Sequence, residues 1–194
     1  MFDLLKTKIT SYISLEPDEL DLLDGYFEQR VLKRKEMLLG EGDVCKFIAF
    51  IDSGTIRHYH TKNGNEKTCD ISFAGSWVTD FQSFNSGASG IMNLQAMETT
   101  EVSVISNKKL SELYARCPKY ETYGRIMAEQ VAQRATDIAM SLSSEKPEER
   151  FVNLLHTKPD IFQRVSQRYI ANFLGISPES LSRIRARVMK KEKS

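Results

Sequence analysis

Three side chains near the end of the sequence, Glu179, Ser180 and Arg183, have the chemistry to read the edges of DNA bases. An arginine guanidinium can donate to O6 and N7 of one guanine, and a carboxylate can accept from N4 of cytosine. At helical spacing Glu179 and Arg183 share one face near the start of a helix, the part of such helices that meets base edges. The two side chains could also pair weakly with each other.

The segment 166–188 is typical of two helices joined by a tight turn. Ser166 suits the N-cap of the first helix, and Gly175 supplies the positive φ that ends it. Ser177 suits the N-cap of the second helix and Pro178 its first position. The apolar residues predicted to face inward are Ile170, Ala171, Leu174, Leu181, Ile184 and Val188, with Ile176 at the corner. The spacing indicates a helix-turn-helix, and the alternative is an ordinary pair of antiparallel helices.

The charge of the chain is uneven, which favours binding of a polyanion by its last quarter. Residues 151–194 carry nine Lys and Arg against three Asp and Glu, whereas residues 1–150 carry 18 against 23. Polar groups at a helix N-terminus and exposed cations suit phosphate contacts. The residues predicted to contact phosphate are Ser166, Gln167, Arg168, Ser177 and Arg187.

The first half of the chain is predicted to form a β-sandwich or a β-roll behind an N-terminal helix. Short runs such as KFIAFIDSG, TIRHYHTK, EKTCDISF and TEVSVISN are rich in β-branched and aromatic residues and are divided by glycines. Asn63-Gly64 indicates a hairpin, because both turn residues must accept positive φ. The segment SLEPDELDLLDGYFEQRVL is expected to open with a helix that Ser14 caps.

A long helix is predicted over residues 118–144. Its apolar stripe packs either on its own β-roll or on a second copy, and a homodimer is favoured. The stripe consists of Tyr123, Ile126, Met127, Val131 and Ile138. A short helix PEERFVNLLHTK follows the break at Pro147, and PDIFQRV is expected to form a small hairpin or wing.

The chain resembles the Crp/Fnr family of transcription regulators over roughly residues 14–190. The resemblance is carried by Gly40-Glu41-Gly42-Asp43, by IDSGTIRHYHTKNGNEKTCDISFAGSWV and by SQRYIANFLGISPESLSRIR. It implies an α+β fold: an antiparallel, jelly-roll-like β-roll of the cyclic-nucleotide-binding type (residues 1–117), a long dimerisation helix (118–144) and a winged helix-turn-helix (145–194).

The resemblance also implies a function. The protein is expected to regulate transcription as a homodimer on an inverted repeat in double-stranded DNA, with RNA polymerase as a further partner. Glu179, Ser180 and Arg183 match the family's base-facing positions. Pro178 stands where the family often has an arginine, which implies a different operator sequence.

The positions that hold a cyclic nucleotide in the family are altered. An ungapped comparison places Thr79-Asp80 on the family's Gly-Glu pair and Gly90-Ile91 on its Arg-Ser pair. Asp80 can still accept from a hydroxyl, but Gly90 cannot counter a phosphate, and a desolvated anion without a cation is costly. We therefore expect no tight binding of cAMP or cGMP. An unidentified, less charged effector is the alternative.

No cofactor or catalytic site is expected. Cys45, Cys69 and Cys117 are too few and too dispersed for an iron–sulfur cluster. A distant alternative is a cupin-like metal enzyme using His58 and His60, with Cys69 opposite His58 across the hairpin.

The location of the protein follows from what the sequence lacks. The absence of a long apolar run or a signal-peptide pattern, together with the odd cysteine count, predicts a cytoplasmic protein without membrane contact.

Overall fold

The structure is a computed structural model that describes residues 2–191. It divides into two compact units, Met1–Glu129 and Gln130–Ser194. The first contains all strands of the described residues, and the second is helical. Among residues 2–191 no helix combines the length and apolar character needed to cross a bilayer.

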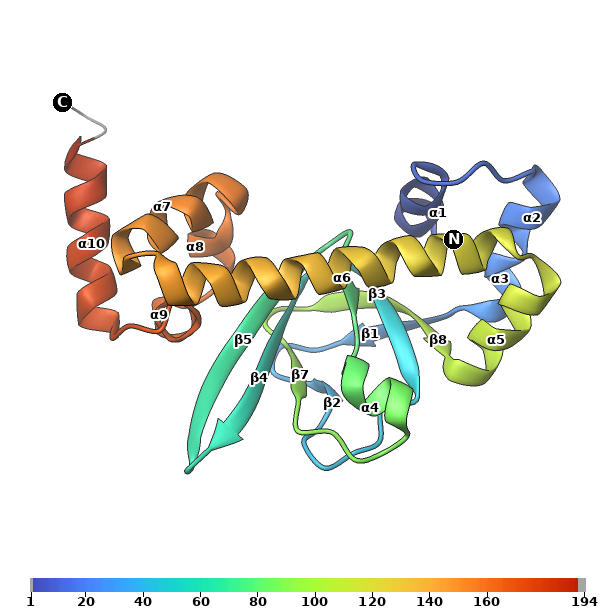
Figure 1. The fold of residues 1–194 in the computed structure, drawn as a ribbon, viewed down its shortest axis with the longest axis horizontal. Coiled ribbons are helices and arrows are strands. Elements are labelled where there is room, and N and C mark those ends of the chain that lie inside the picture. Colours follow the sequence, from blue (N-terminus) through green and yellow to red (C-terminus); the bar gives the residue numbers. More distant parts are fainter. Residues whose placement is uncertain (1, 192–194) are drawn as a thin grey trace. The chain divides into compact units, whose positions relative to one another are not determined.

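Two four-stranded antiparallel sheets form the body of the first unit (Figure 1). One sheet has the order β1 (Glu28–Leu32), β8 (Thr100–Ser106), β3 (Phe47–Ser53) and β6 (Trp77–Val78). The other has the order β2 (Met37–Leu39), β7 (Asn93–Ala96), β4 (Thr55–Lys62) and β5 (Asn65–Phe73). The antiparallel β-roll that the family resemblance implied, one of the two folds that the strand spacing allowed, is therefore confirmed.

The two sheets enclose an apolar core. Ile51 on β3, Ile56 on β4 and Leu94 on β7 are fully buried there, with Cys45 beside them. Each fully buried aliphatic side chain contributes about 1.5–3 kcal/mol relative to an exposed one.

A second core joins the N-terminal helices to one sheet. The N-terminal helices are α1 (Asp3–Thr10), α2 (Pro17–Asp21) and α3 (Leu23–Tyr26), and α5 (Asn107–Arg116), which follows β8, packs on the same core. Leu5, Ile9 and Leu23 pack there with Phe50 of β3 and Leu113 of α5. These contacts explain why such short helices are stable, because packing rather than intrinsic propensity supplies most helical stability.

The N-terminal segment contains the expected helix, but the predicted cap was wrong. Helix α2 begins at Pro17 with Glu16 at the N-cap, and Ser14 lies outside it. The Glu16 N–H donates to the carboxylate of Glu19 at 2.8 Å. A carboxylate three residues into the helix thus satisfies the N-cap amide, as in a capping box.

The hairpin predicted at Asn63-Gly64 is confirmed. Both residues have positive φ (53° and 73°), and Lys62 pairs with Asn65 across the turn. The expected pairing of His58 with Cys69 was wrong, because a bulge shifts the register and places Asp70 opposite His58. An extra residue in one strand of a hairpin changes every pair beyond it.

Helix α6 (Lys119–Ser144) is the long helix predicted from the apolar stripe. Tyr123, predicted for a dimer stripe, is instead 5% exposed in the core of its own unit. Its hydroxyl accepts from Trp77 Nε1 at 2.9 Å. Met127 is partly buried against the same core. Helical spacing identifies one face of a helix but does not say what covers it.

In the described part of the chain, four helices follow α6. They are α7 (Pro147–Thr157), α8 (Ile161–Arg164), α9 (Gln167–Phe173) and α10 (Pro178–Lys191). The hairpin or wing expected at PDIFQRV was wrong, since this segment forms a turn and α8. Ile161 and Val165 are buried whereas Gln163 between them is exposed. In a strand all three would share one face, so this burial fits a helical turn.

Candidate nucleic-acid interface and sensor pocket

The turn between α9 and α10 is built by the residues predicted for it. Gly175 has φ of 70°, and the Ile176 N–H donates to the Ala171 carbonyl at 3.0 Å. The hydroxyl of Ser177 accepts from the Ser180 N–H at 3.2 Å, and α10 begins at Pro178. These bonds satisfy groups that helix ends leave without partners.

The inner faces of the two helices are packed as the apolar spacing predicted. Ala171 is fully buried, and its small side chain suits a close crossing of α9 and α10. The other inward residues, all at most 8% exposed, are Ile170, Leu174, Leu181, Ile184 and Val188. Burial of this face fixes the rotation of α10 about its axis, and therefore which side chains point outward.

The predicted base-reading residues lie on the opposite face of α10. Glu179 and Arg183 are exposed, and Ser180 is half-buried beside the cap. Arg183 Nε donates to the main-chain carbonyl of Glu179 at 3.4 Å. Hydrogen bonds from Ser177 and from its own backbone N–H, together with the charge of Arg183, hold the pKa of the Glu179 carboxyl below its usual range. This face therefore presents an ionised acceptor beside a guanidinium donor.

The predicted phosphate-contacting residues are exposed at two places. Ser166, Gln167 and Arg168 lie at the start of α9. Ser166 occupies the N-cap position, although its side chain makes no capping hydrogen bond. Arg187 on α10 forms an ion pair with Glu148 of α7 at 2.7 Å. No local pattern signals that pair, since its members lie 39 residues apart.

Thr79 and Asp80, which were compared with the family's Gly-Glu pair, make hydrogen bonds within the roll. Asp80 caps helix α4 (Phe81–Ser86), and its Oδ1 accepts from the Ser83 N–H at 3.0 Å. Its Oδ2 is buried and has no hydrogen-bond partner among the residues that the structure describes. The Thr79 hydroxyl donates to the Phe47 carbonyl at 2.9 Å and lies 3.3 Å from Cys45 Sγ.

Gly90 lies directly against that carboxylate, so the structure brings positions 80 and 90 together as the ungapped comparison placed them. A Cβ added at Gly90 would collide with Asp80 Oδ2 and approach Ser83 Cβ to 3.1 Å. Backbone bonds with Gly42 and Asp43, both 2.9 Å, hold Gly90 in place. Ile91 is 61% exposed. A side chain at position 90 would therefore require Asp80 and Ser83 to shift, and glycine itself offers no cation to counter a phosphate.

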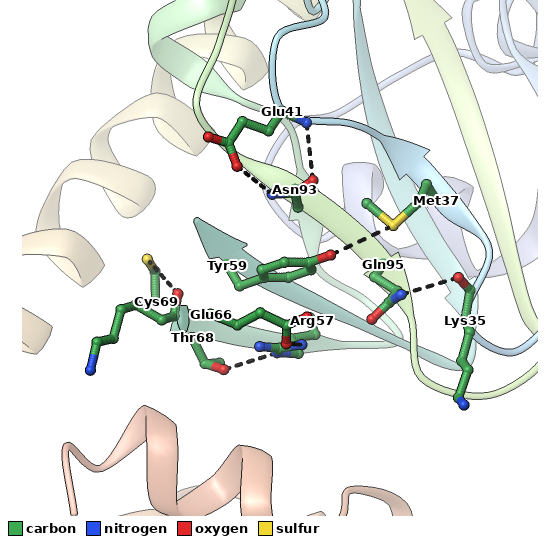
Figure 2. A network of polar contacts seen from close by, with 11 residues as sticks. Lys35, Met37, Glu41, Arg57, Tyr59, Glu66, Thr68, Cys69, Asn93 and Gln95 are labelled. Carbon is green, nitrogen blue, oxygen red and sulfur yellow. Dashed lines mark hydrogen bonds and ion pairs between the residues drawn. The ribbon is translucent and has the colours of Figure 1, made fainter. Parts of the chain in front are cut away.

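Arg57 is the only buried Lys or Arg among the described side chains, and sequence reasoning missed it. Figure 2 shows its guanidinium with Thr68 and Glu66 directed at it. Nε donates to Thr68 Oγ1 at 2.9 Å, Nη1 donates to Glu66 at 2.8 Å, and the group lies 4.1 Å from the Tyr59 ring centroid. On β4, Arg57 points away from the face that carries the core residue Ile56. This cation is therefore committed within the β4–β5 hairpin.

The histidines of β4 do not gather a metal-binding set. His60 Nδ1 lies 3.2 Å from Cys69 Sγ, and His58 Nε2 lies 3.1 Å from the Ser72 hydroxyl. Burial raises the pKa of the Cys69 thiol, which disfavours a thiolate ligand. Over residues 2–191 no group of three or more His, Cys, Asp or Glu side chains is arranged to hold a metal ion.

The sequence is similar to a known domain and to known regulatory proteins. The profile of the cyclic nucleotide-binding domain matches residues 29–117. The fumarate and nitrate reduction regulatory protein of Yersinia pestis is 30% identical over 197 residues, covering 91% of this chain and 75% of the relative. Its counterpart in Escherichia coli K12 is 28% identical over 194 residues with the same coverage.

A solved structure with the same fold covers both units. FixK2 from Bradyrhizobium japonicum superposes with a TM-score of 0.72 at 18% identity, over 86% of each chain. The named relatives are transcription regulators rather than enzymes. The chain belongs to the Crp/Fnr family of transcription regulators, whose members bind DNA and act as dimers.

Proposed function

We propose that this protein is a homodimeric regulator that binds an inverted repeat in double-stranded DNA and acts on RNA polymerase. In this proposal residues 1–117 form an effector-like roll, 118–144 the dimerisation helix and 145–194 the DNA-binding domain. The observation that carries the proposal is the face of α10: Glu179 and Arg183 are exposed at its start, while Leu181 and Ile184 are buried behind them.

Contacts with DNA divide into two kinds. Arg183 suits a guanine and Glu179 a cytosine, with Ser180 beside them, and these contacts specify sequence. The groups proposed for phosphate are Ser166, Gln167, Arg168, Ser177 and Arg187. Phosphate contacts fix register on the duplex but carry no sequence information.

The proposed dimer rests on apolar groups along α6. Val131 is 42% exposed, and Ile126, Met127 and Ile138 are partly exposed on the same helix. Met140 and Leu142 extend the exposed apolar surface toward its end, at 60% and 50%. A second α6 would cover these groups. In the proposed dimer the two copies of α10, the recognition helix, lie about 34 Å apart, which is one turn of B-DNA.

The geometry around position 90 supports the proposal that the protein does not bind cAMP or cGMP tightly. Position 90 has no cation, a side chain there would collide with Asp80, and Arg57 is bound to Thr68 and Glu66. A cyclic phosphate would thus lose its water without gaining a counter-charge. Titration calorimetry with either nucleotide should show no binding at micromolar concentration. A micromolar or tighter Kd contradicts this part of the proposal.

A second candidate function is control by a different small molecule. The buried Oδ2 of Asp80, which lacks a hydrogen-bond donor in the described part of the chain, favours it. A ligand that reaches this oxygen must carry an N–H, an O–H or positive charge rather than a phosphate, because unmet buried acceptors gain most from donors.

One experiment tests the DNA-binding proposal and the effector question together. Fragments bound by the full chain are selected from random DNA, with and without a small-molecule extract of cells. The proposal predicts enrichment of an inverted repeat with half-sites one helical turn apart. Enrichment only in the presence of extract favours the effector-gated form, whereas no enriched motif under either condition contradicts both.

A further inference from the structure

Arg150 on α7 connects two distant points of the second unit. Its Nη1 donates to the main-chain carbonyl of Glu145 at 2.6 Å, directly after the end of α6. Its Nη2 donates to the main-chain carbonyl of Leu174 at 2.9 Å, and Leu174 is the C-cap of α9. One guanidinium thus joins the end of the long helix to the turn of the helix-turn-helix.

The electrostatics of this arrangement are favourable at both ends. Carbonyls at the C-terminus of a helix lack intrahelical donors, and the helix dipole places partial negative charge there. Arg150 therefore lies between two helix C-termini, those of α6 and α9. The planar fork of an arginine can donate in two directions at once, which a lysine ammonium on one flexible stem does less well.

The position has an energetic penalty that argues for a specific purpose. Arg150 Nε is buried and has no hydrogen-bond partner within residues 2–191. An unmet buried donor is unfavourable, and more so when it belongs to a charged group. An apolar residue would avoid this penalty but would leave two carbonyls without donors. The two-way bridge is the gain that offsets the unmet donor.

Glu145 is itself held on both sides, so the bridge ends at a fixed point. Its carboxylate accepts from the Ser141 hydroxyl of α6 at 2.6 Å and from Asn153 Nδ2 of α7 at 3.1 Å. A continuous polar path therefore runs from the last turn of α6 through Arg150 to Leu174. Gly175, Ile176 and Ser177 then lead directly to α10.

We infer that Arg150 is a positioning residue that fixes the direction of α10 relative to the end of α6. The inference rests on the proposed function, because only a dimer joined along α6 converts that direction into a distance between two recognition helices. In such a dimer Arg150 sets which half-site spacing the protein accepts, without touching DNA itself.

The test measures the affinity of the full-length protein for operators in which two half-sites are separated by a varied number of base pairs. The wild type should prefer one spacing by about tenfold or more over a spacing changed by two base pairs. In Arg150→Ala and in Arg150→Lys this preference should fall to about threefold or less, while affinity for a single half-site stays within about threefold.

Arg185→Ala is the matched control. Arg185 lies on α10, where its guanidinium is 5.1 Å from the Phe162 ring, and it is exposed. Loss of this cation should weaken all spacings alike and leave the preference unchanged. Circular dichroism at the temperature of the binding assay verifies folding, and Arg150→Lys keeps the test decisive if Arg150→Ala is unfolded.

The outcomes separate the inference from the proposed function. If the wild type binds no inverted repeat, the proposed function fails and the inference with it. If the wild type binds with a spacing preference that both Arg150 variants retain, the inference alone is overturned. A uniform loss at every spacing and at the single half-site would show that Arg150 only stabilises the fold, which also overturns it.

Discussion

The helix-turn-helix and the nucleotide-binding positions of the roll, 79–80 and 90–91, differ in how well they fit their roles in the family. In the first, Gly175, Ser177 and Pro178 each occupy the conformation that the motif requires, and Arg183 faces outward. In the second, Gly90 packs on the carboxylate of Asp80 where an arginine side chain would be needed. The geometry therefore fits the proposed reading of DNA more closely than it fits the binding of a cyclic nucleotide.

The largest expected effect comes from breaking the packing behind the recognition face. Leu181→Ala removes a fully buried side chain between α9 and α10. A leucine-to-alanine change in a core costs about 2–5 kcal/mol, so the second unit should melt at a much lower temperature and DNA binding should be lost. Differential scanning calorimetry measures the shift. An unchanged melting profile with full DNA affinity would show that this helix face is not the core described.

The contact between Gly90 and Asp80 in the roll predicts a smaller loss of stability when a side chain is added there. Gly90→Ala places a Cβ against Asp80 Oδ2, and overpacking of this kind costs about 1–3 kcal/mol. Gly25→Ala is the control, because an added Cβ there meets nothing within 4 Å. Urea unfolding should show a lower midpoint for the first variant only. Equal midpoints would mean that position 90 has room for a side chain after all.

The Glu179 carboxylate on α10 is expected to contribute to base preference by a free energy similar to the loss expected for Gly90→Ala. Glu179→Ala should remove about 1–3 kcal/mol of preference for cytosine over the other bases at one position of each half-site. Ser182→Ala, an exposed change on the same helix, serves as the control. Competition binding with single-base operator variants measures the effect. Retention of the full preference would mean that Glu179 does not read a base.

The smallest expected effect concerns a phosphate contact. Arg168→Ala at the start of α9 should weaken binding to all sequences by a similar factor. The slope of log K against log salt should decrease in magnitude by about 0.9, as expected for one lost phosphate contact. Fluorescence anisotropy over a salt series measures it. A change of base preference instead would move Arg168 into the sequence-reading group.

Sequence reasoning succeeded where the determining chemistry is local. Gly175, Ser177 and Pro178 act within a few residues of their own position, so their roles follow from residue type and spacing. The Asn63-Gly64 turn was predictable for the same reason. Runs of strand-forming residues divided by glycines predicted a sandwich or a roll without knowledge of strand partners, and the family resemblance chose the roll.

Sequence reasoning failed where a distant segment or a small register change decides the outcome. The partner of Arg187 is Glu148, on another helix, and the core around Tyr123 includes side chains from the distant N-terminal helices. A single bulge on β5 replaced the expected partner of His58. Helix α8 has only four residues, too few to show a helical period, so a strand-like composition misled the interpretation.

The most direct test of the account is the base preference of Arg183→Ala, compared with that of the wild type in parallel selections from random DNA. The account predicts that the wild type enriches a symmetric pair of half-sites, and that the variant loses preference at one symmetry-related base pair in each while the other positions persist. Identical enriched motifs for both proteins would contradict the claim that this face of α10 reads DNA.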